Sequence, residues 1–502
     1  MAIDATAVAR VTGIKTQYKD LRGTVAAQLP QHIAVFAPGS SDVAYSTKKF
    51  QALSHEQVGR TLGWGSLAHL IVRELLPSDG REGVGTIPVT VFPLEDAYEA
   101  VAATGAITPT GTPTKSAECR VRIGGYLSAP FAILKDETVQ SICTKIQNAI
   151  TGVLYMPVKA ESDATKVDLT AKWAGPTGND ITIEVIGEVP GVDFAVSAMS
   201  GGLLNPDVSG ALAQIGDVWI TMGINGLNVE DTTTLDAFQT FGGEPGTETT
   251  AGSGRWNPLI NKPLVVFVGN TKTDPSDATT EVSTRVTDCV NVQLVAPGSP
   301  MLPAVAAARQ VARIARLANN TPAHDYGSQQ ADGIIPGSDG DQWDYTAREF
   351  AVTNGSSTSV VSGGRVTISD VVTPYRPQGE EPPPYRFVVD IVRLQNIIYN
   401  VALRFNTPEW DGAPLVNDED VVTEPTAKKP KFAKALVGQV LEGLGKLAII
   451  TDVAESKQQT QAYVAGPKRL AIKVPTKLSG NTNIKDITIE WGFLFGSAPV
   501  VE

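Results

Sequence analysis

The sequence has few of the side chains from which metal centres and active sites are usually built. Its 502 residues include three cysteines and four histidines. Cys119, Cys143 and Cys289 are far apart and form no CxxC pair, which argues against a compact thiolate metal site. We expect three reduced, mostly buried thiols, as in proteins that are made and kept in a cytoplasm.

Long apolar runs and an excess of basic residues are also missing. No apolar run approaches the roughly 20 residues that a membrane-spanning helix needs. The opening MAIDATAVARVTG lacks the basic and apolar regions of a signal peptide. The formal net charge of -12 argues against a general nucleic-acid binder. We expect a soluble protein that stays in a cytoplasm until it is assembled or released, with no membrane insertion and no direct contact with nucleic acid.

The motifs of common enzymes are absent or incomplete. No histidines form HExxH or HxH, and no serine lies in GxSxG. GLGKL (443–447) lacks the hydroxyl residue and the upstream glycine of a phosphate loop. SDGDQWD (338–344) has Trp343 where a calcium loop needs a ligand, which favours a solvated turn. His324 beside Asp325 is interpreted as a locally bonded loop histidine, with a metal or general-base pair as the alternative. The sequence therefore predicts a non-enzyme without cofactor or metal.

Near-continuous apolar strands alternate with helical patterns in two separate parts of the chain. Such strands are buried on both faces, which favours a layered α/β core. A helix is expected over 58–76, and a second over 302–320 with Pro303 in its first turn. The expected core strands are 32–39, 87–94, 217–224, 263–270 and 291–298.

Residues 109–202 differ in composition from both parts and are interpreted as a compact, mostly β inserted domain. They are rich in Thr and Gly and carry short alternating strands. One helix is expected among them, with Asp136 as a plausible N-cap. Its apolar face carries Val139, Ile142, Cys143, Ile146 and Ile150, and the expected strands are 119–123, 166–171 and 181–186.

Two basic patterns lie in the second half of the chain. Arg309, Arg313 and Arg316 form one stripe on the 302–320 helix; a solvated face is favoured, and a protein–protein contact is the alternative. The segment AKKPKFAKAL (427–436) is too short and too interrupted by proline to predict nucleic-acid binding. Its lysines are interpreted as part of a disordered hinge or as a contact for an acidic protein surface; they are Lys428, Lys429, Lys431 and Lys434.

The C-terminal part is read as a hairpin, a helix and closing strands. TSVVSGGRVTIS (358–369) predicts a hairpin that turns at Gly363 and Gly364, and a helix follows around 391–405. The sequence ends IKDITIEWGFLFGSAPVVE, in which every second residue from Ile487 to Phe495 is apolar. This strand either completes the sheet of its own last domain or pairs with another chain; its apolar residues are Ile487, Ile489, Trp491, Phe493 and Phe495.

Read in order, five segments resemble the contractile tail sheath protein of Mu-like bacteriophages. RVTGIKTQYKD (10–20) resembles the family's opening arm, and NTNIKDITIEWGFLF (481–495) resembles its closing strand. Segments 189–219, 300–337 and 354–377 resemble the return from an inserted domain, an Ala-rich helix with its following loop, and a hairpin. We identify a divergent member of this family, because Thr12, Lys15, Asn320, Thr321, His324 and Asp370 depart from its pattern, while Pro322, Ala323, Gly333, Ile334, Thr373 and Tyr375 keep it.

The resemblance implies a non-enzymatic protein that forms stacked hexameric rings around a rigid tail tube. On a signal from the baseplate, such a sheath shortens and widens and drives the tube through the cell envelope. The implied partners are further copies of the chain, the tail tube protein, and the baseplate and tail-terminator proteins. The implied location is the virion, after assembly in the host cytoplasm.

The resemblance also implies extended N- and C-terminal arms that add strands to the sheets of neighbouring subunits. The candidate arm residues are Val8, Val11, Ile14, Tyr18, Ile487, Ile489, Trp491, Phe493 and Phe495, and the candidates for a tube-facing surface are Lys428, Lys429, Lys431 and Lys434. The expected division is an arm at 1–25, a core domain at 26–108 and 203–378, an inserted outer domain at 109–202, an inner, tube-facing domain at 379–486, and a terminal strand at 487–502.

Three alternatives remain open at this point. The sheath of a related device, such as a bacteriocin-like or secretion machine, would have the same sequence features. A hydrolase with an unusual site is a second alternative. A capsid or tube protein is the third, although tube proteins are much shorter and an α/β core with a β insertion suits neither.

Overall fold

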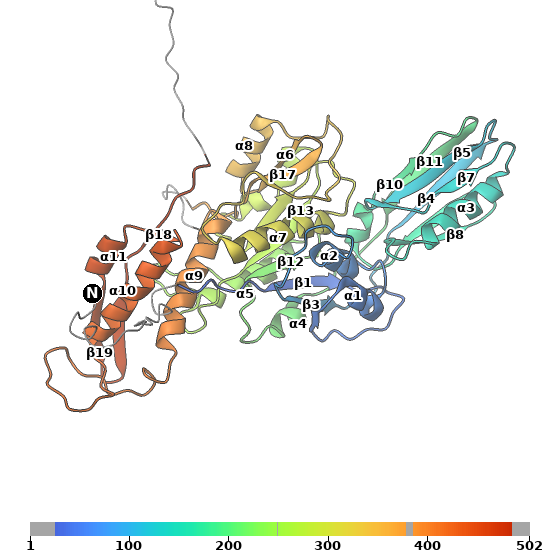
Figure 1. The fold of residues 1–502 in the computed structure, drawn as a ribbon. Coiled ribbons are helices and arrows are strands. Elements are labelled where there is room, and N and C mark those ends of the chain that lie inside the picture. The colour runs from blue at the N-terminus through green and yellow to red at the C-terminus, as the bar shows by residue number, and fades with distance from the viewer. Residues whose placement is uncertain (1–25, 248, 378–384, 484–502) are drawn as a thin grey trace, which may run out of the picture.

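The computed structural model describes residues 26–247, 249–377 and 385–483. Figure 1 shows an elongated molecule of three units in a row, with a central core, a β-rich unit at one end and a helical unit at the other. The β-rich unit is formed by a stretch inserted between two parts of the core, and the helical unit by the C-terminal part of the described chain. The expected class, a mixed α/β fold with several sheets, is confirmed.

A six-stranded sheet forms the centre of the core, in the order β14-β13-β12-β1-β3-β2. Five of its strands are parallel, and only the short edge strand β2 is antiparallel to its neighbour. Every residue of β1, β13 and β14 is buried, which explains their continuous apolar sequences. The strands are β1 (Ile33–Pro38), β2 (Phe50–Ala52), β3 (Val89–Leu94), β12 (Met222–Asn225), β13 (Val265–Asn270) and β14 (Asn291–Val295).

Helices cover this sheet, and one of the predicted helices is divided into two. The expected helix over 58–76 is instead α1 (His55–Leu62) and α2 (Leu67–Leu75). The backbone is left-handed at Gly63 and Gly65, which ends the first helix, and the side chain of Ser66 caps the second. The other helices of this unit are α4 (Ser209–Ala213), α5 (Thr232–Gly242), α6 (Pro275–Thr279), α7 (Pro303–Asn320) and α8 (Tyr345–Thr353), with short turns at η4 (Gly254–Trp256) and η5 (Val282–Thr284).

Helix α7 confirms the predicted 302–320 helix but corrects the interpretation of its arginine stripe. Arg309 is 3% exposed, and its guanidinium donates to the carbonyl oxygens of Glu74, Glu82 and Asp332. Arg313 and Arg316 both bind the Glu82 carboxylate, at 3.1 Å each. The stripe is therefore an internal contact rather than a solvated face, because the loop after α2 folds over it.

The inserted unit consists of two small sheets and one helix. The first sheet has the order β11-β4-β9-β8; in the second, β10, β6 and β7 all pair with β5. Helix α3 (Val139–Thr151) is capped by Thr138 rather than by Asp136, whose φ is 62°. The strands are β4 (Thr104–Gly111), β5 (Ala117–Ile123), β6 (Tyr126–Leu127), β7 (Phe131–Ile133), β8 (Val158–Ser162), β9 (Val167–Ala171), β10 (Ile183–Ile186) and β11 (Val192–Ser200), with a turn at η3 (Pro176–Asp180).

The expected boundary at residue 109 falls inside β4, which pairs with β9 and β11 from Thr104 onward. Val101 and Leu203 form an antiparallel bridge where the chain enters and leaves the inserted unit. Arg73 of α2 lies 4.2 Å from the ring centroid of Tyr155 in the inserted unit, a cation–π contact. The inserted unit is thus held to the core by side chains as well as by its two connections.

A hairpin and the C-terminal unit complete the described chain. The hairpin of β16 (Thr358–Ser362) and β17 (Arg365–Asp370) turns at Gly363 and Gly364, both left-handed, as predicted; β15 (Gln329–Gln330) extends its sheet. The predicted helix around 391–405 is α9 (Val388–Phe405). The other elements are α10 (Pro430–Lys446), α11 (Val453–Gln459), β18 (Ile450–Thr451), β19 (Gln461–Gly466), β20 (Arg469–Lys473) and β21 (Lys477–Leu478).

Helix α10 occupies the segment that the sequence left open between a hinge and a contact surface. Its Val437, Leu441 and Leu444 are buried in a separate small core, against which Val401 and Phe405 of α9 pack. Pro430 stands in the first turn, where its missing N–H costs nothing. The lysines therefore lie just before and within the start of a packed helix, and GLGKL is simply the end of that helix.

Candidate assembly surfaces

The core sheet is doubly wound. The loop at the edge where such sheets usually bind ligands is hydrogen-bonded to the inserted unit. The order of strands reverses between β1 and β12, and ligands normally bind beyond the carboxyl ends of the strands at such a point. Here the loop after β1 contacts the inserted unit: the Ser41 amide donates to the Lys172 carbonyl at 2.8 Å. Lys172 Nζ in turn donates to the Trp64 carbonyl at 2.9 Å. Burial lowers the pKa of this lysine to about 8.

The histidines of the core are structural. The Gly65 amide donates to Nδ1 of His69 at 3.0 Å, so the proton of the neutral ring is on Nε2. That nitrogen lies 3.4 Å from Nδ1 of His55, whose Nε2 lies 2.9 Å from Ser78 Oγ. Burial lowers the pKa of His69 to about 3, so the pair stays neutral. His324 makes the expected local contact, with Nδ1 2.6 Å from the Asp325 carbonyl.

The described residues contain neither an assembled metal site nor a reactive thiol. Within residues 26–247, 249–377 and 385–483, no three His, Cys, Asp or Glu side chains gather as metal ligands would. Cys119, Cys143 and Cys289 are buried and unpaired, as predicted, and burial raises the pKa of each thiol. No helix in the same ranges is both long and apolar enough to cross a bilayer.

The four lysines proposed for the tube-facing surface lie together, and each has a partner within its own chain. Lys428 Nζ lies 5.3 Å from the ring centroid of Trp410, and Lys429 donates to the carbonyl of Asp420. Lys431 Nζ lies 5.9 Å from the ring of Phe432, and Lys434 Nζ lies 3.5 Å from the Gln458 carbonyl. The structure therefore brings these four together, but none is a free, unpartnered charge.

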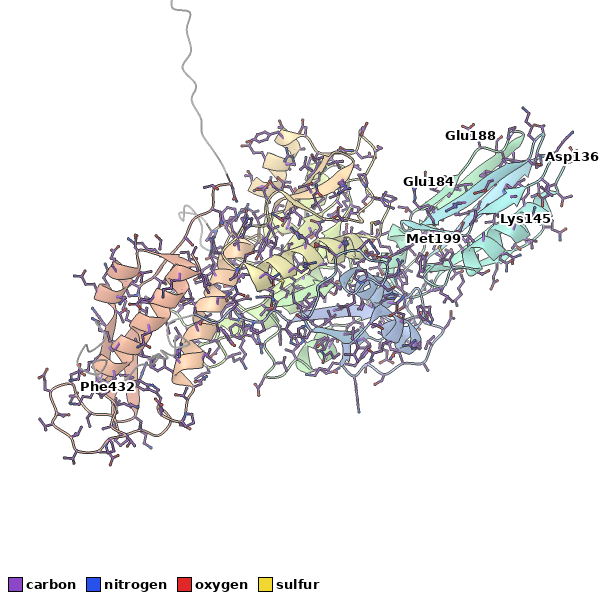
Figure 2. All side chains as sticks on the ribbon, viewed as in Figure 1. Asp136, Lys145, Glu184, Glu188, Met199 and Phe432 are labelled. Carbon is purple, nitrogen blue, oxygen red and sulfur yellow. The ribbon has the colours of Figure 1, made fainter. Side chains whose placement is uncertain are left out.

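The surroundings of the lysines are mixed in character rather than simply basic. The preceding loop carries Asp418, Glu419, Asp420 and Glu424, so the local formal charges cancel. Exposed apolar side chains accompany them: Val421 is fully exposed and Phe432 is 47% exposed. Figure 2 shows Phe432 on the unit farthest from the inserted one. Trp410 and Phe432 were not named as candidate surface residues from the sequence, although Phe432 stands next to Lys431 in the sequence.

The candidate arm residues lie outside the described residues, but the described residues next to each of these segments make specific contacts. The Ala27 and Leu29 amides donate to the side-chain oxygens of Asn400 and Asn396, at 2.9 Å each. At the other end, Arg393 Nη2 donates to Asn481 Oδ1 at 2.7 Å. Positions 393, 396 and 400 lie on one buried face of α9. One helix thus gathers both ends of the described chain, a role that periodicity alone could not reveal.

Open strand edges occur in the same unit. Strand β18 pairs only with β21, and β19 only with β20, among the strands that the structure describes. A two-stranded sheet is marginal alone, and its unpaired backbone groups can accept a further strand. The C-terminal unit therefore carries unpaired strand edges among its described residues.

The described residues form an elongated α/β protein with open strand edges at its C-terminal unit. The chain is 26% identical, over 341 residues, to the "Mu-like prophage FluMu tail sheath protein" of Haemophilus influenzae, and the match covers 66% of each chain. The match thus spans just under two thirds of that relative's length. No protein-family model matches the chain.

Two solved structures of sheath tail proteins are also similar in fold. One is from Listeria innocua, with 12% identity, a TM-score of 0.45 and coverage of 91% of this chain and 94% of the other. The second is from Desulfitobacterium hafniense, with 10% identity, a TM-score of 0.46 and coverage of 94% and 97%. At these TM-scores the similarity adds nothing to the sequence match. That match confirms the predicted resemblance to the tail sheath protein of Mu-like phages.

Proposed function

We propose that this protein is the structural subunit of a contractile phage tail sheath and part of the virion. The observation that carries the proposal is the sequence match to a Mu-like prophage tail sheath protein. In this role, copies of the chain form stacked hexameric rings around a tail tube. They shorten on a signal from the baseplate and drive the tube through the host envelope. The sheath of a related injection device is the alternative, and the neighbouring genes would distinguish the two.

Subunits stay linked during contraction through their terminal arms, which is the second part of the proposal. The proposal is supported by Ala27, Leu29 and Asn481, which lie next to the proposed arms and bond to the buried face of α9, beside the unit that carries open strand edges. Each main-chain hydrogen bond to a neighbour contributes roughly 0.5–1.5 kcal/mol net, and each buried Ile or aromatic side chain about 1.5–3 kcal/mol. A terminal strand with five such side chains stays bound to the neighbouring subunit while the folded units rotate past each other. Contraction then requires no bond hydrolysis.

Deleting the residues after Asp486 tests this linkage. We expect soluble subunits that keep most of their fold but build no sleeves in negative-stain microscopy, because the unit that receives the strand is intact and the strand is missing. Striated sleeves from the truncated chain, equal to those of the full chain, would refute the exchange at this end.

A matched pair of variants within the strand separates its two faces. Trp491→Ser with Phe493→Ser removes the apolar face and should abolish sleeves. Thr488→Ser with Glu490→Gln alters only the alternate face and should leave them unchanged. Equal loss in both variants would show that the strand matters for a reason other than its apolar face.

A further inference from the structure

A cleft of about 620 Å³ opens at the seam between the inserted unit and the core, and it is rich in carboxylates. Asp180 reaches it from the inserted unit, at the end of η3. Glu230 and Asp231 reach it from the loop between β12 and α5 of the core, and Asp207 from the chain that returns to the core. The described residues that line the cleft include no lysine or arginine.

One hydrogen bond crosses the seam at Asp180. The side-chain amide of Asn228, which follows β12 in the core, donates to Asp180 Oδ2 at 3.0 Å. The other half of the cleft is fixed separately: Asn205 Nδ2 donates to Asp231 Oδ2 at 2.9 Å, and Asp231 caps α5. The contact between Asp180 and Asn228 therefore links the η3 turn to the loop after β12, while Asn179 of the same turn exchanges two hydrogen bonds with Gly202, just before the chain returns to the core.

The protonation of Asp180 is balanced close to neutral pH. Burial, and then the charge of Glu230, raise its pKa from the ordinary 3.8 to about 7. Lys272 and the bond from Asn228 act in the opposite direction. Lys272 is itself bound to Glu230, at 2.6 Å, which leaves Asp180 without a direct cationic partner in the described chain. Asp207 is exposed and accepts the Ser209 amide at 2.9 Å within its own segment.

We propose that this seam is a proton-controlled latch, in which protonated Asp180 keeps the η3 turn docked on the core and ionised Asp180 releases it. In the docked state Asp180 is partly buried beside Glu230, so its ionised form lacks much of the water that would stabilise the charge. When the turn swings away, Asp180 regains water and the charge costs little. The inference goes beyond the sheath role, since it concerns the joint between two units of a single chain.

The direction of the effect follows from proton linkage. Asp180 has a higher pKa in the docked state, about 7, than in the released state, where the ordinary value is 3.8. Docking is therefore most favourable when the pH is below the lower value, and it is lost progressively as the pH rises to about 7. Three other groups of the protein act with the opposite sign. Lys172, with a pKa of about 8, acts above this window. His55 and His69, whose pKa values burial lowers, weaken the fold towards acid.

Hydrogen exchange of the full chain at pH 5.5 and 7.5, corrected for the intrinsic pH dependence of exchange, tests the latch. Peptides covering 173–181 should open on the order of tenfold more often at pH 7.5, because each pH unit below the docked pKa changes the equilibrium by up to about tenfold. Asp180→Asn, which cannot ionise, should abolish this increase. Asp207→Asn, in the same cleft but bonded within its own segment, should behave like the unchanged protein.

A second variant keeps the test decisive if Asp180→Asn does not fold. Glu230→Gln removes a charge that raises the pKa of Asp180 and frees Lys272, which lowers it. The opening transition should therefore move to lower pH. An Asp180→Asn protein with an unchanged pH dependence, or a Glu230→Gln protein with an unshifted transition, would overturn the proposal.

Discussion

A buried guanidinium at position 309 joins helix α7 to the loop that follows it and to a segment more than 220 residues earlier in the chain. Arg309 donates to the carbonyls of Glu74, Glu82 and Asp332, and burial lowers its pKa through desolvation. A charge in such a place is tolerated because its donors are satisfied. Removing it leaves three acceptors to find other partners inside the protein.

We predict that Arg309→Met lowers the free energy of unfolding of the core by about 3 kcal/mol, the usual scale for breaking a buried polar network. Arg316→Met is the matched control on the same helix. Arg316 is about one third exposed and binds an exposed carboxylate, so its loss should cost less than about 1 kcal/mol. Urea unfolding of both variants checks this, and equal losses would contradict the role assigned to Arg309.

The difference between these two arginines could not be predicted from the sequence. Helical spacing places both on one stripe of α7, and that spacing is all that a pattern reports. Burial of the first depends on where a loop near Glu82 folds, some 230 residues earlier in the chain. The contact between His55 and His69 could not be predicted either. The tautomer of His69 is set by the backbone amide of Gly65, whose position depends on the fold.

Secondary-structure elements show which local signals are sufficient. Strands β1, β13 and β14 are continuous apolar runs between turn residues, and helix α7 has a long regular period, so all four were predicted. Helix α10 was not, because Pro430 and the lysines around it resemble a linker until α9 provides a surface to pack against. Two glycines sufficed to break the expected 58–76 helix.

The lysines at the start of α10 give a prediction at this scale. Lys431→Glu with Lys434→Glu should weaken binding of the sheath to its tube several-fold at low salt and less at high salt, because exposed charge pairs are screened. Co-sedimentation of sheath and tube at two salt concentrations measures it. Lys429 is left in place, since it holds the 417–425 loop.

The matched control reverses two exposed lysines elsewhere. Lys115→Glu with Lys135→Glu makes the same change in net charge on the inserted unit. If these variants weaken binding equally, the effect is one of overall charge. An assembled tail in which all four lysines near α10 point away from the tube would contradict their assignment outright.

At the scale of the whole molecule, the joint between the inserted unit and the core determines how the two can be separated. The chain enters and leaves through the bridge between Val101 and Leu203, whose amides and carbonyls bond reciprocally at 3.1 Å. A cut at residue 109 would leave half of β4 attached to the core without its partners. The division into an outer domain and a core stays a prediction, and the bridge shows where to test it.

We predict that replacing residues 102–202 by a short Gly/Ser linker leaves a chain that is soluble and still builds sleeves. The same linker in place of 109–202 should give less soluble protein, because unpaired strand residues remain. Expression, sedimentation and microscopy of both variants measure the outcome. Insoluble protein from both would show that contacts such as Arg73 with Tyr155 make the inserted unit part of the core.

The placement of the two ends of the described chain, opposite the inserted unit, has a practical consequence. Both described ends lie against α9, whereas the loops that carry Asp136 and Glu188 form the far tip of the molecule (Figure 2). A foreign peptide grafted into either tip loop would be displayed as far as the molecule allows from the segments proposed to polymerise. Under the proposed linkage, a tag at either terminus would be built into every joint between subunits, so loops rather than ends should carry the cargo.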